Sequence, residues 1–196
     1  MSGMSVRASF IGLVFAAALG SAATGAAAQT APKWVVDPAH SQLTFDSQAE
    51  GMAFTGTFKD WDADIHFDPK ALDQSKVVVT VSTGSAITGD DSRDQTARSS
   101  DWFATAMFPK ATFTSQDFKD LGGGRYEADG TLTIRGVSQP LVLPFTLAIT
   151  GDAATMTGVT TVDRSLFGVG QGDNGGADVV PLEVTLKVQL AAKLAK

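Results

Sequence analysis

The stretch "LVLPFTLAI" at residues 141–149 carries a large apolar side chain at every second position. Successive side chains of a β-strand point to opposite faces, so this period of two predicts a strand with one buried face. Pro144 lies inside the stretch, and proline has no backbone N–H to donate to a neighbouring strand. We therefore expect a local break in strand pairing at Pro144.

The same alternation returns along much of the chain, as in "VVVTV" at 77–81 and "VVPLEVTLKVQL" at 179–190. Clusters of turn-forming residues separate the later strands, at 121–125, 135–140 and 150–154. These patterns predict an all-β fold in which most strands are joined as hairpins. Eight strands are expected, at 40–48, 51–67, 76–83, 110–118, 125–135, 139–150, 154–162 and 179–190.

The long second strand changes phase partway along. Phe54 and Phe58 share one face, whereas Trp61 and Ile65 belong to a face that is one residue out of step. A bulge near residues 59–60 would reconcile the two halves. Eight antiparallel strands that close into a barrel lose their free edges and enclose an interior able to hold one small ligand.

One segment, "GDDSRDQTARSSDWFATAMFPK" at 89–110, does not alternate. Ser99 or Ser100 is a candidate N-cap, and Trp102 and Met107 belong to an apolar group at helical spacing that follows it. We expect one or two short helices between the third and fourth strands, where they would cover a mouth of the barrel.

The first residues have the order of a secretory signal peptide. Arg7 precedes an apolar run from Ala8 to Gly20, and small residues follow, ending in Ala26-Ala27-Ala28. The run is shorter than the roughly 20 residues of a membrane-spanning helix. We therefore expect a cleaved signal at 1–28, a short spacer at 29–33 and one folded, exported domain at 34–196.

Composition excludes several classes of function. The chain contains no cysteine, so disulfides, thiolate metal sites and cysteine nucleophiles are impossible. The formal net charge of −6 disfavours nucleic acid, whose binding depends on Lys and Arg meeting phosphates, and it disfavours anionic lipid surfaces. No segment after the signal is long and apolar enough to span a bilayer, so we expect no stable membrane anchor.

Three residue types of a hydrolytic triad occur within "DPAHS" at 37–41. On a strand, His40 and Ser41 would point to opposite faces, so they cannot form a base–nucleophile pair with each other. His66, the only other histidine, is out of phase with the inward residues around it. We interpret the segment as a turn at Asp37 that enters the first strand, with His40 fastening the barrel end.

Two further motifs have structural explanations. In "DWDADIH" at 60–66, three aspartates and His66 fall on one flat strand face, which does not converge as a site of oxygen ligands must. The stretch "GVGQGDNGGAD" at 168–178 contains the letters G-x-G-x-x-G, but a strand follows it instead of the helix that dinucleotide binding needs. We expect a solvated strand face and a flexible loop at the barrel rim, and neither a metal nor a cofactor.

Four blocks that follow one another along the chain are similar to a known family. They are "DPAHSQLTF" at 37–45, "FPKATF" at 108–113, "LTIRGVSQP" at 132–140 and "DRSLFG" at 163–168. Together they resemble the YceI-like family of exported polyisoprenoid-binding proteins, from about Trp34 to the C-terminus. The resemblance implies an extended, lipocalin-like, eight-stranded antiparallel barrel in the bacterial periplasm, whose hydrophobic tunnel holds a long isoprenoid or fatty-acyl chain without catalysis.

On this interpretation the protein is a non-catalytic carrier or reservoir for an isoprenoid or a related lipid. A polar or phosphorylated headgroup would meet Arg93 and Arg164 at a barrel end, with His40 nearby. A tail that leaves the barrel allows a homodimer to cover it. The expected ligand-binding residues are the inward aromatic and aliphatic residues and these three polar ones: Phe45, Phe54, Phe58, Phe67, Val79, Trp102, Phe103, Phe113, Ile134, Phe145, Phe167, His40, Arg93 and Arg164.

Two alternatives stay open at this point, because periodicity alone does not distinguish a filled barrel from a hollow one. One is an enzyme that acts on a lipid-like substrate, which predicts a convergent polar cluster inside the barrel. The other is a structural or stress-response module, either with a filled core or binding fatty-acyl or amide lipids.

Overall fold

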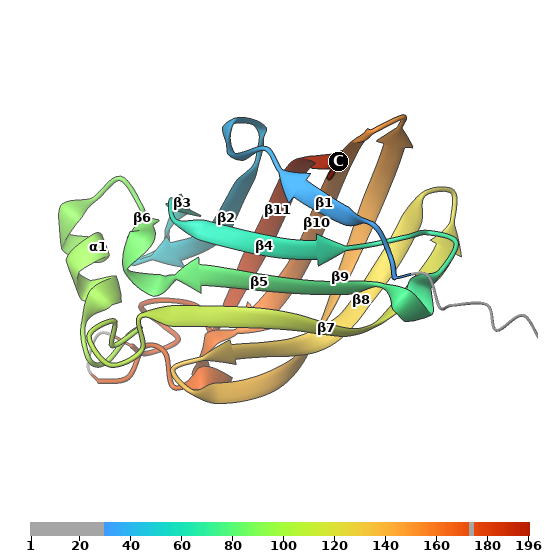
Figure 1. The fold of residues 1–196 in the computed structure, drawn as a ribbon. Coiled ribbons are helices and arrows are strands. Elements are labelled where there is room, and N and C mark those ends of the chain that lie inside the picture. The colour runs from blue at the N-terminus through green and yellow to red at the C-terminus, as the bar shows by residue number, and fades with distance from the viewer. Residues whose placement is uncertain (1–29, 173–174) are drawn as a thin grey trace, which may run out of the picture.

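Antiparallel strands make up most of the computed structural model, which describes residues 30–172 and 175–196 (Figure 1). The predicted signal peptide at 1–28 lies outside the described residues. These form one α-helix, α1 (Asp91–Arg98), and four 3-10 helices, η1 (Pro38–His40), η2 (Leu72–Gln74), η3 (Thr83–Ser85) and η4 (Arg164–Phe167). The strands are β1 (Lys33–Val36), β2 (Gln42–Ala49), β3 (Met52–Phe58), β4 (Trp61–His66), β5 (Lys76–Ser82), β6 (Ala86–Ile87), β7 (Lys110–Gly122), β8 (Arg125–Ile134), β9 (Val137–Thr150), β10 (Ala153–Asp163) and β11 (Glu183–Leu194).

The sheet closes into a barrel of eight strand positions. The order around it is β1-β4-β5-β7-β8-β9-β10-β11, and β1 pairs with β11 to complete the circle. β2, β3 and β6 continue the first three positions, because η1 separates β1 from β2, residues 59–60 separate β3 from β4, and η3 separates β5 from β6. The predicted eight-stranded antiparallel barrel is confirmed, together with the interruption near residues 59–60.

The first and last strands differ from their predicted bounds. β1 was missed because "KWVV" is too short to show a period, and part of it lies in the predicted spacer. His40 lies in η1 instead of a strand, since Asp37 caps this turn and Pro38 opens it. The final strand starts at Glu183, and Leu182 precedes it with 37 % of its surface exposed.

Pro144 interrupts pairing as predicted. The ladder between β9 and β10 runs from Thr150↔Ala153 to Phe145↔Gly158 and then stops. The next pair would use Pro144, which has no N–H to donate. On the other side, β9 pairs with β8 from Val137 to Thr146, so this ladder continues past Pro144.

The predicted helix exists, but its expected start is wrong. α1 begins after Asp90, whose side chain accepts a hydrogen bond from the Arg93 N–H at 2.9 Å. Ser99 is the C-cap, and its carbonyl accepts bonds from Trp102 N and Ala104 N that fold the following residues into turns. The region therefore holds one helix that ends where we expected one to begin.

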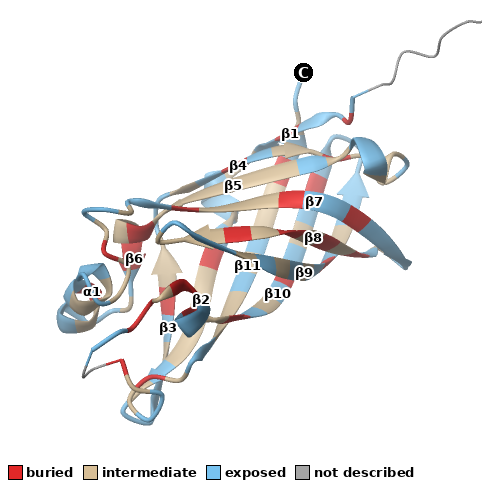
Figure 2. Ribbon diagram, turned by 90° about the horizontal axis from the view of Figure 1, so that it is seen from below, coloured by how far each residue is buried: buried red, intermediate tan, exposed pale blue. Residues whose placement is uncertain are grey.

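The two ends of the barrel differ. α1, η4 and the glycine-rich loop after η4 gather at one end, which we call the helix end (Figure 1). The opposite end carries the β7–β8 and β9–β10 turns at 122–125 and 150–153, and we call it the hairpin end. Buried residues recur with a period of two along β8, and inward residues alternate with exposed ones along β10 (Figure 2), as expected for strands with one side facing a core.

Two groups of buried residues fill the interior. The group toward the hairpin end is built on Trp34, Phe67, Phe118, Tyr126 and Phe145. The group toward the helix end consists of Leu132, Val162, Phe167 and Val169. Both groups are apolar, so hydrophobic packing holds the barrel together toward each of its ends.

Candidate functional site

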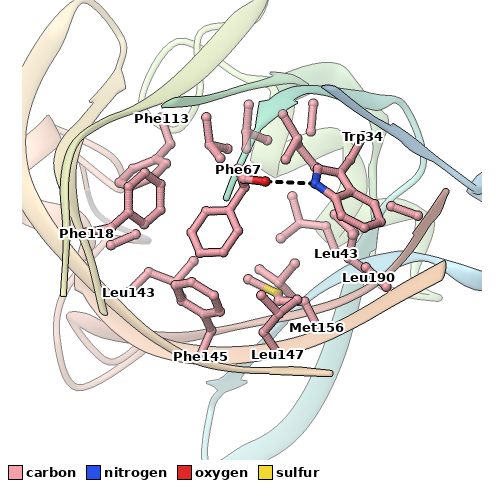
Figure 3. A pocket seen from close by; sticks show the side chains of 18 of the residues that line it. Trp34, Leu43, Phe67, Phe113, Phe118, Leu143, Phe145, Leu147, Met156 and Leu190 are labelled. Atoms are coloured by element: carbon pink, nitrogen blue, oxygen red, sulfur yellow. Dashed lines mark hydrogen bonds between the residues drawn. The ribbon is translucent and has the colours of Figure 1, made fainter. Parts of the chain in front are cut away.

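An apolar cavity of about 120 Å³ lies inside the barrel (Figure 3). Strands from both sides of the barrel contribute to it, and every lining residue is hydrophobic. No charged or hydroxyl-bearing side chain reaches the cavity wall. The lining residues are Trp34, Leu43, Trp61, Ala63, Ile65, Phe67, Val77, Val79, Phe113, Phe118, Ala128, Leu143, Phe145, Leu147, Ile149, Ala154, Met156, Val188, Leu190 and Ala192.

Phe67 is the centre of the cavity's aromatic wall. Its ring meets Phe118, Tyr126 and Phe145 edge to face, with centroids 5.2, 5.7 and 6.2 Å away. The Trp34 indole donates a buried hydrogen bond to the Phe67 carbonyl at 3.0 Å (Figure 3). Because this bond satisfies the indole N–H, Trp34 presents only carbon to the cavity.

Four residues predicted to bind a ligand line this cavity, namely Phe67, Val79, Phe113 and Phe145. The alternation that identified them also runs through Leu143, Leu147 and Leu190, which also line the cavity but were left out of the predicted site. Trp34 was missed because β1 was missed.

Other predicted residues form a second aromatic group farther along the barrel. Phe45 contacts Phe54 and Phe58, with ring centroids 6.3 and 5.2 Å apart, and Phe58 contacts Phe103 at 6.2 Å. The remaining three predicted apolar residues pack in the group toward the helix end: Trp102, Ile134 and Phe167.

Arg164 is buried under the glycine-rich loop, with 4 % of its surface exposed. Its five N–H donors all meet backbone carbonyls, from 2.6 to 3.2 Å away, and its guanidinium lies 5.1 Å from the Trp102 ring centre. Burial lowers the pKa of Arg164, and Asp163 opposes this shift. The accepting carbonyls belong to Pro181, Val169, Gly170, Gly175 and Val180.

The glycines of this loop make room for Arg164. A Cβ at Gly170 would lie 2.1 Å from the Arg164 Nη1 atom, and a Cβ at Gly175 would lie 2.0 Å from the Gly170 oxygen. The G-x-G-x-x-G letters therefore serve a buried arginine, and their central residues, 173–174, lie outside the described residues. Since Arg164 has no donor left, this geometry contradicts its predicted contact with a headgroup.

A YceI-like domain model matches residues 34–192. The chain belongs to the YceI-like family. Curated relatives include a UPF0312 protein of Shewanella baltica, 33 % identical with 80 % of this chain and 86 % of the relative covered. Protein YceI of Escherichia coli O6:H1 is 37 % identical, with 75 % and 76 % covered.

Solved structures share the architecture of this YceI-like domain. Burkholderia cenocepacia BcnA matches with a TM-score of 0.78 and 33 % identity, over 81 % of this chain and all of that one. A polyisoprenoid binding domain from Saccharophagus degradans matches with a TM-score of 0.67 over 84 % and 99 %. At 18 % identity this second match speaks for the fold alone. Among the described residues, no helix is both long and apolar enough to cross a membrane.

Arg93 lies at the helix end of the YceI-like domain, beside the second aromatic group. Its guanidinium carbon is 4.7 Å from the Phe54 ring centre. Among the described residues, its side chain donates two long hydrogen bonds, to Thr88 Oγ1 at 3.3 Å and to the Thr88 carbonyl at 3.4 Å. Arg93 is half-buried, so its guanidinium lies at the rim of the apolar interior.

His40 is remote from Arg164. The Asp37 N–H donates to the Ala191 carbonyl, whereas the Arg164 N–H donates to the Leu182 carbonyl. Nine residues of extended β11 separate these two points, which is about 30 Å at roughly 3.3 Å per residue. The expectation that His40 lies near Arg164 is therefore wrong.

The triad residues do not form a catalytic array. His40 Nδ1 lies 2.9 Å from Asp37 Oδ2 on the surface. Ser41 Oγ instead bridges to Ala191, accepting from its N–H at 3.0 Å and donating to its carbonyl at 3.3 Å. Ser41 thus takes the place of a ladder contact on β11, whereas His40 bonds to Asp37 within the turn.

The aspartate stripe on β4 faces outward as predicted. Asp64 forms an ion pair with Lys33 at 2.9 Å, and its oxygen is 3.7 Å from His66 Nε2. No group of three or more histidines and carboxylates in the described part of the chain is placed to hold a metal ion.

We predict that Arg164→Met destabilises the fold, because it leaves five carbonyl groups of the loop without their donor. Unsatisfied buried acceptors cost about 1–3 kcal/mol each, and water will rescue some of these, so we expect a loss of about 3 kcal/mol in the free energy of unfolding. Denaturant unfolding measures it. Arg93→Met is the control, with an expected loss of about 1 kcal/mol or less; equal losses in the two variants would contradict the structural role of Arg164.

We also predict that His40→Gln raises the pKa of Asp37 toward 3.8. The His40 hydrogen bond is the largest cause that holds the pKa of Asp37 below this value. A lowered pKa means that this pair stabilises the fold above pH 3.8 and that the contribution is lost as the pH falls through the lowered pKa. Carboxyl NMR titration tests this, with His66→Gln as the control; an unchanged Asp37 titration in His40→Gln would contradict it.

Proposed function

We propose that this YceI-like domain is a non-catalytic binding protein that sequesters the long apolar chain of a lipid inside its barrel. The observation that carries the proposal is the cavity wall, where all lining residues are hydrophobic. Binding sites usually combine an apolar lining with a few polar groups that orient the ligand. Among the described residues, the wall of this cavity carries no such polar group, which favours a ligand that is recognised by its hydrocarbon part.

Burial of hydrocarbon supplies enough affinity for such a ligand. Each methylene group removed from water contributes roughly 0.8 kcal/mol. The cavity of about 120 Å³ is smaller than the roughly 300–1,000 Å³ of ordinary ligand pockets, so a long tail must also displace side chains. Met156 is suited to this because its thioether side chain is unbranched and adapts to its surroundings.

Isoprenoid is the leading ligand class. We infer this class from the Saccharophagus degradans domain, a polyisoprenoid binding domain whose fold this chain shares. The interior has two aromatic groups in line, around Phe67 and around Phe45, and such a lining suits an extended unsaturated chain. Fatty-acyl and quinone-type tails meet the same chemistry.

The headgroup belongs at the helix end in this proposal. Arg93 is held there by two long hydrogen bonds and lies beside Phe54. Arg164 has no free donor, and His40 lies toward the other end. The tail then extends from the Phe54 region toward Trp34 and Phe67.

Export to the periplasm completes the proposal, together with a homodimer as the form that covers an emerging tail. The order of residues 1–28 supports cleavage and export. A carrier in that compartment would hold apolar lipids out of water.

Organic extraction of the purified protein, followed by mass spectrometry, tests the proposal. We expect about one lipid per chain, with a prenyl or acyl tail. Added prenyl or acyl lipids should raise the melting temperature of delipidated protein, because a ligand that binds only the folded state stabilises it. Repeated absence of lipid, with no rise in melting temperature, would refute the proposed function.

Ala154→Leu should reduce lipid retention several-fold. Ala154 is buried and lines the cavity, so a larger side chain there occupies the volume that the tail needs. Ala153→Leu is the matched control, since Ala153 is the exposed neighbour on the same strand. Lipid per chain after purification is the measurement, and equal retention in both variants would show that the tail does not use this cavity.

A further inference from the structure

The wall of the barrel has an unpaired stretch between β9 and β10, which we call the seam. Pairing of these strands ends at Phe145↔Gly158, so residues 137–144 of β9 and 159–163 of β10 have no ladder partner in each other. Both strands continue regularly on their other sides. β8 pairs with β9 as far as Val137, and all eleven residues of β10 pair with β11.

Two prolines build the seam into the sequence. In β9 the Leu147 N–H points to β8, where it meets the Gly124 carbonyl, so even-numbered residues turn their backbone groups toward β10. In the unpaired stretch these include Pro140, Val142 and Pro144. The prolines have no N–H, and the Val142 carbonyl accepts a bond from Thr160 Oγ1 at 2.9 Å. β9 therefore presents fewer unpaired donors to the seam than a strand without these prolines would, and the Val142 N–H is the donor that remains between them.

The outer surface beside the seam is apolar. Val142 is 44 % exposed and Val159 is 53 % exposed, and they lie on the two strands that flank it. Leu166 of η4 is 55 % exposed. It lies beside β9, because its carbonyl accepts a bond from Nε2 of Gln139 on that strand at 3.4 Å. Exposed apolar groups that adjoin one another mark places where an apolar partner or ligand makes contact.

The seam begins at the wall of the cavity. Gly158 ends the paired stretch, and a Cβ there would lie 3.1 Å from Leu143 Cδ1 and 3.4 Å from Met156 Cε. Leu143 and Met156 both line the cavity. A Cβ there would also lie 3.2 Å from the Pro144 oxygen, so glycine avoids crowding at this point, and the side chains of Leu143 and Met156 lie where the seam meets the interior.

We propose that the seam is a lateral portal through which a lipid chain enters and leaves the barrel between β9 and β10. This inference rests on the proposed function. Opening there breaks the bond from Thr160 Oγ1 to the Val142 carbonyl but no bond between two backbone groups, whereas opening a paired wall breaks several. Val142, Val159 and Leu166 give the hydrocarbon an apolar path on the outside, and Leu143 with Met156 gives way on the inside. A peptide strand is a poorer occupant, since Pro140 and Pro144 offer it no donors.

Hydrogen exchange tests the open edge directly. The ladder pairs Thr157 with Thr146, so the N–H groups of Val159 and Thr161 face the seam by the same alternation. We expect these two amides to exchange at least 100-fold faster than those of Thr155 and Thr157. Equal protection would mean that the wall is closed, and would overturn the proposal.

Cross-linking tests the passage of ligand. The chain has no cysteine, so introduced pairs react alone. Val142→Cys with Thr161→Cys places one thiol on each side of the seam, and a short bismaleimide joins them. The matched control is Thr146→Cys with Thr157→Cys in the paired stretch of the same two strands, where the native hydroxyls are 2.7 Å apart.

The readout is stopped-flow uptake of N-phenyl-1-naphthylamine, an apolar fluorescent probe, by delipidated protein. We expect the cross-seam link to slow association at least tenfold and the control link to change it less than twofold, with the equilibrium affinity kept in both. Pro144→Ala, which restores a donor to β9, should also slow uptake without a cross-link. Fast uptake in the cross-seam variant would overturn the portal and direct entry to the helix end. Absence of probe binding in unmodified protein would instead refute the proposed function.

Discussion

Closure of the sheet by β1 and β11 is the constraint on which the rest of this barrel depends. Only three residue pairs make this contact, Trp34↔Leu194, Val35↔Lys193 and Val36↔Ala192. They remove the free edges of the sheet and enclose the interior. Trp34 also connects closure to the cavity, since its indole bonds the Phe67 carbonyl and its ring forms part of the wall.

The barrel separates its chemistry along its axis. The interior near Phe67 is apolar, and Arg93 and Arg164 lie at the helix end. There Arg164 is a structural residue, because it donates to several carbonyls of the glycine-rich loop. This use of a buried cation explains the glycines around it, which must leave space for a guanidinium. Arg93 lies at the same end with few contacts. Arg164 therefore has a structural role, whereas Arg93 is the arginine that we propose meets a headgroup.

The prolines of β9 lie where we propose that the ligand enters the barrel. A closed barrel protects a hydrocarbon chain from water, but it also makes entry difficult. Pro140 and Pro144 weaken the wall at one position by removing donors, and the neighbouring strands keep the barrel intact. The same residues that interrupt the pairing of β9 with β10 thus give the enclosed cavity a side that opens at low cost.

Alternation along the sequence was sufficient to predict the strands, their inward faces and the break at Pro144, because a period of two depends only on strand geometry and solvent. It was sufficient for Phe67, Val79, Phe113 and Phe145 as residues of the interior. β1 and its Trp34 were not predicted, because four residues are too few to show a period. This strand forms only when β11 and β4 lie beside it. The roles of Arg164 and His40 likewise depended on the fold. Which carbonyls surround a guanidinium, and how far a histidine lies from it, follow from contacts between segments far apart in the chain, and no local pattern encodes those distances.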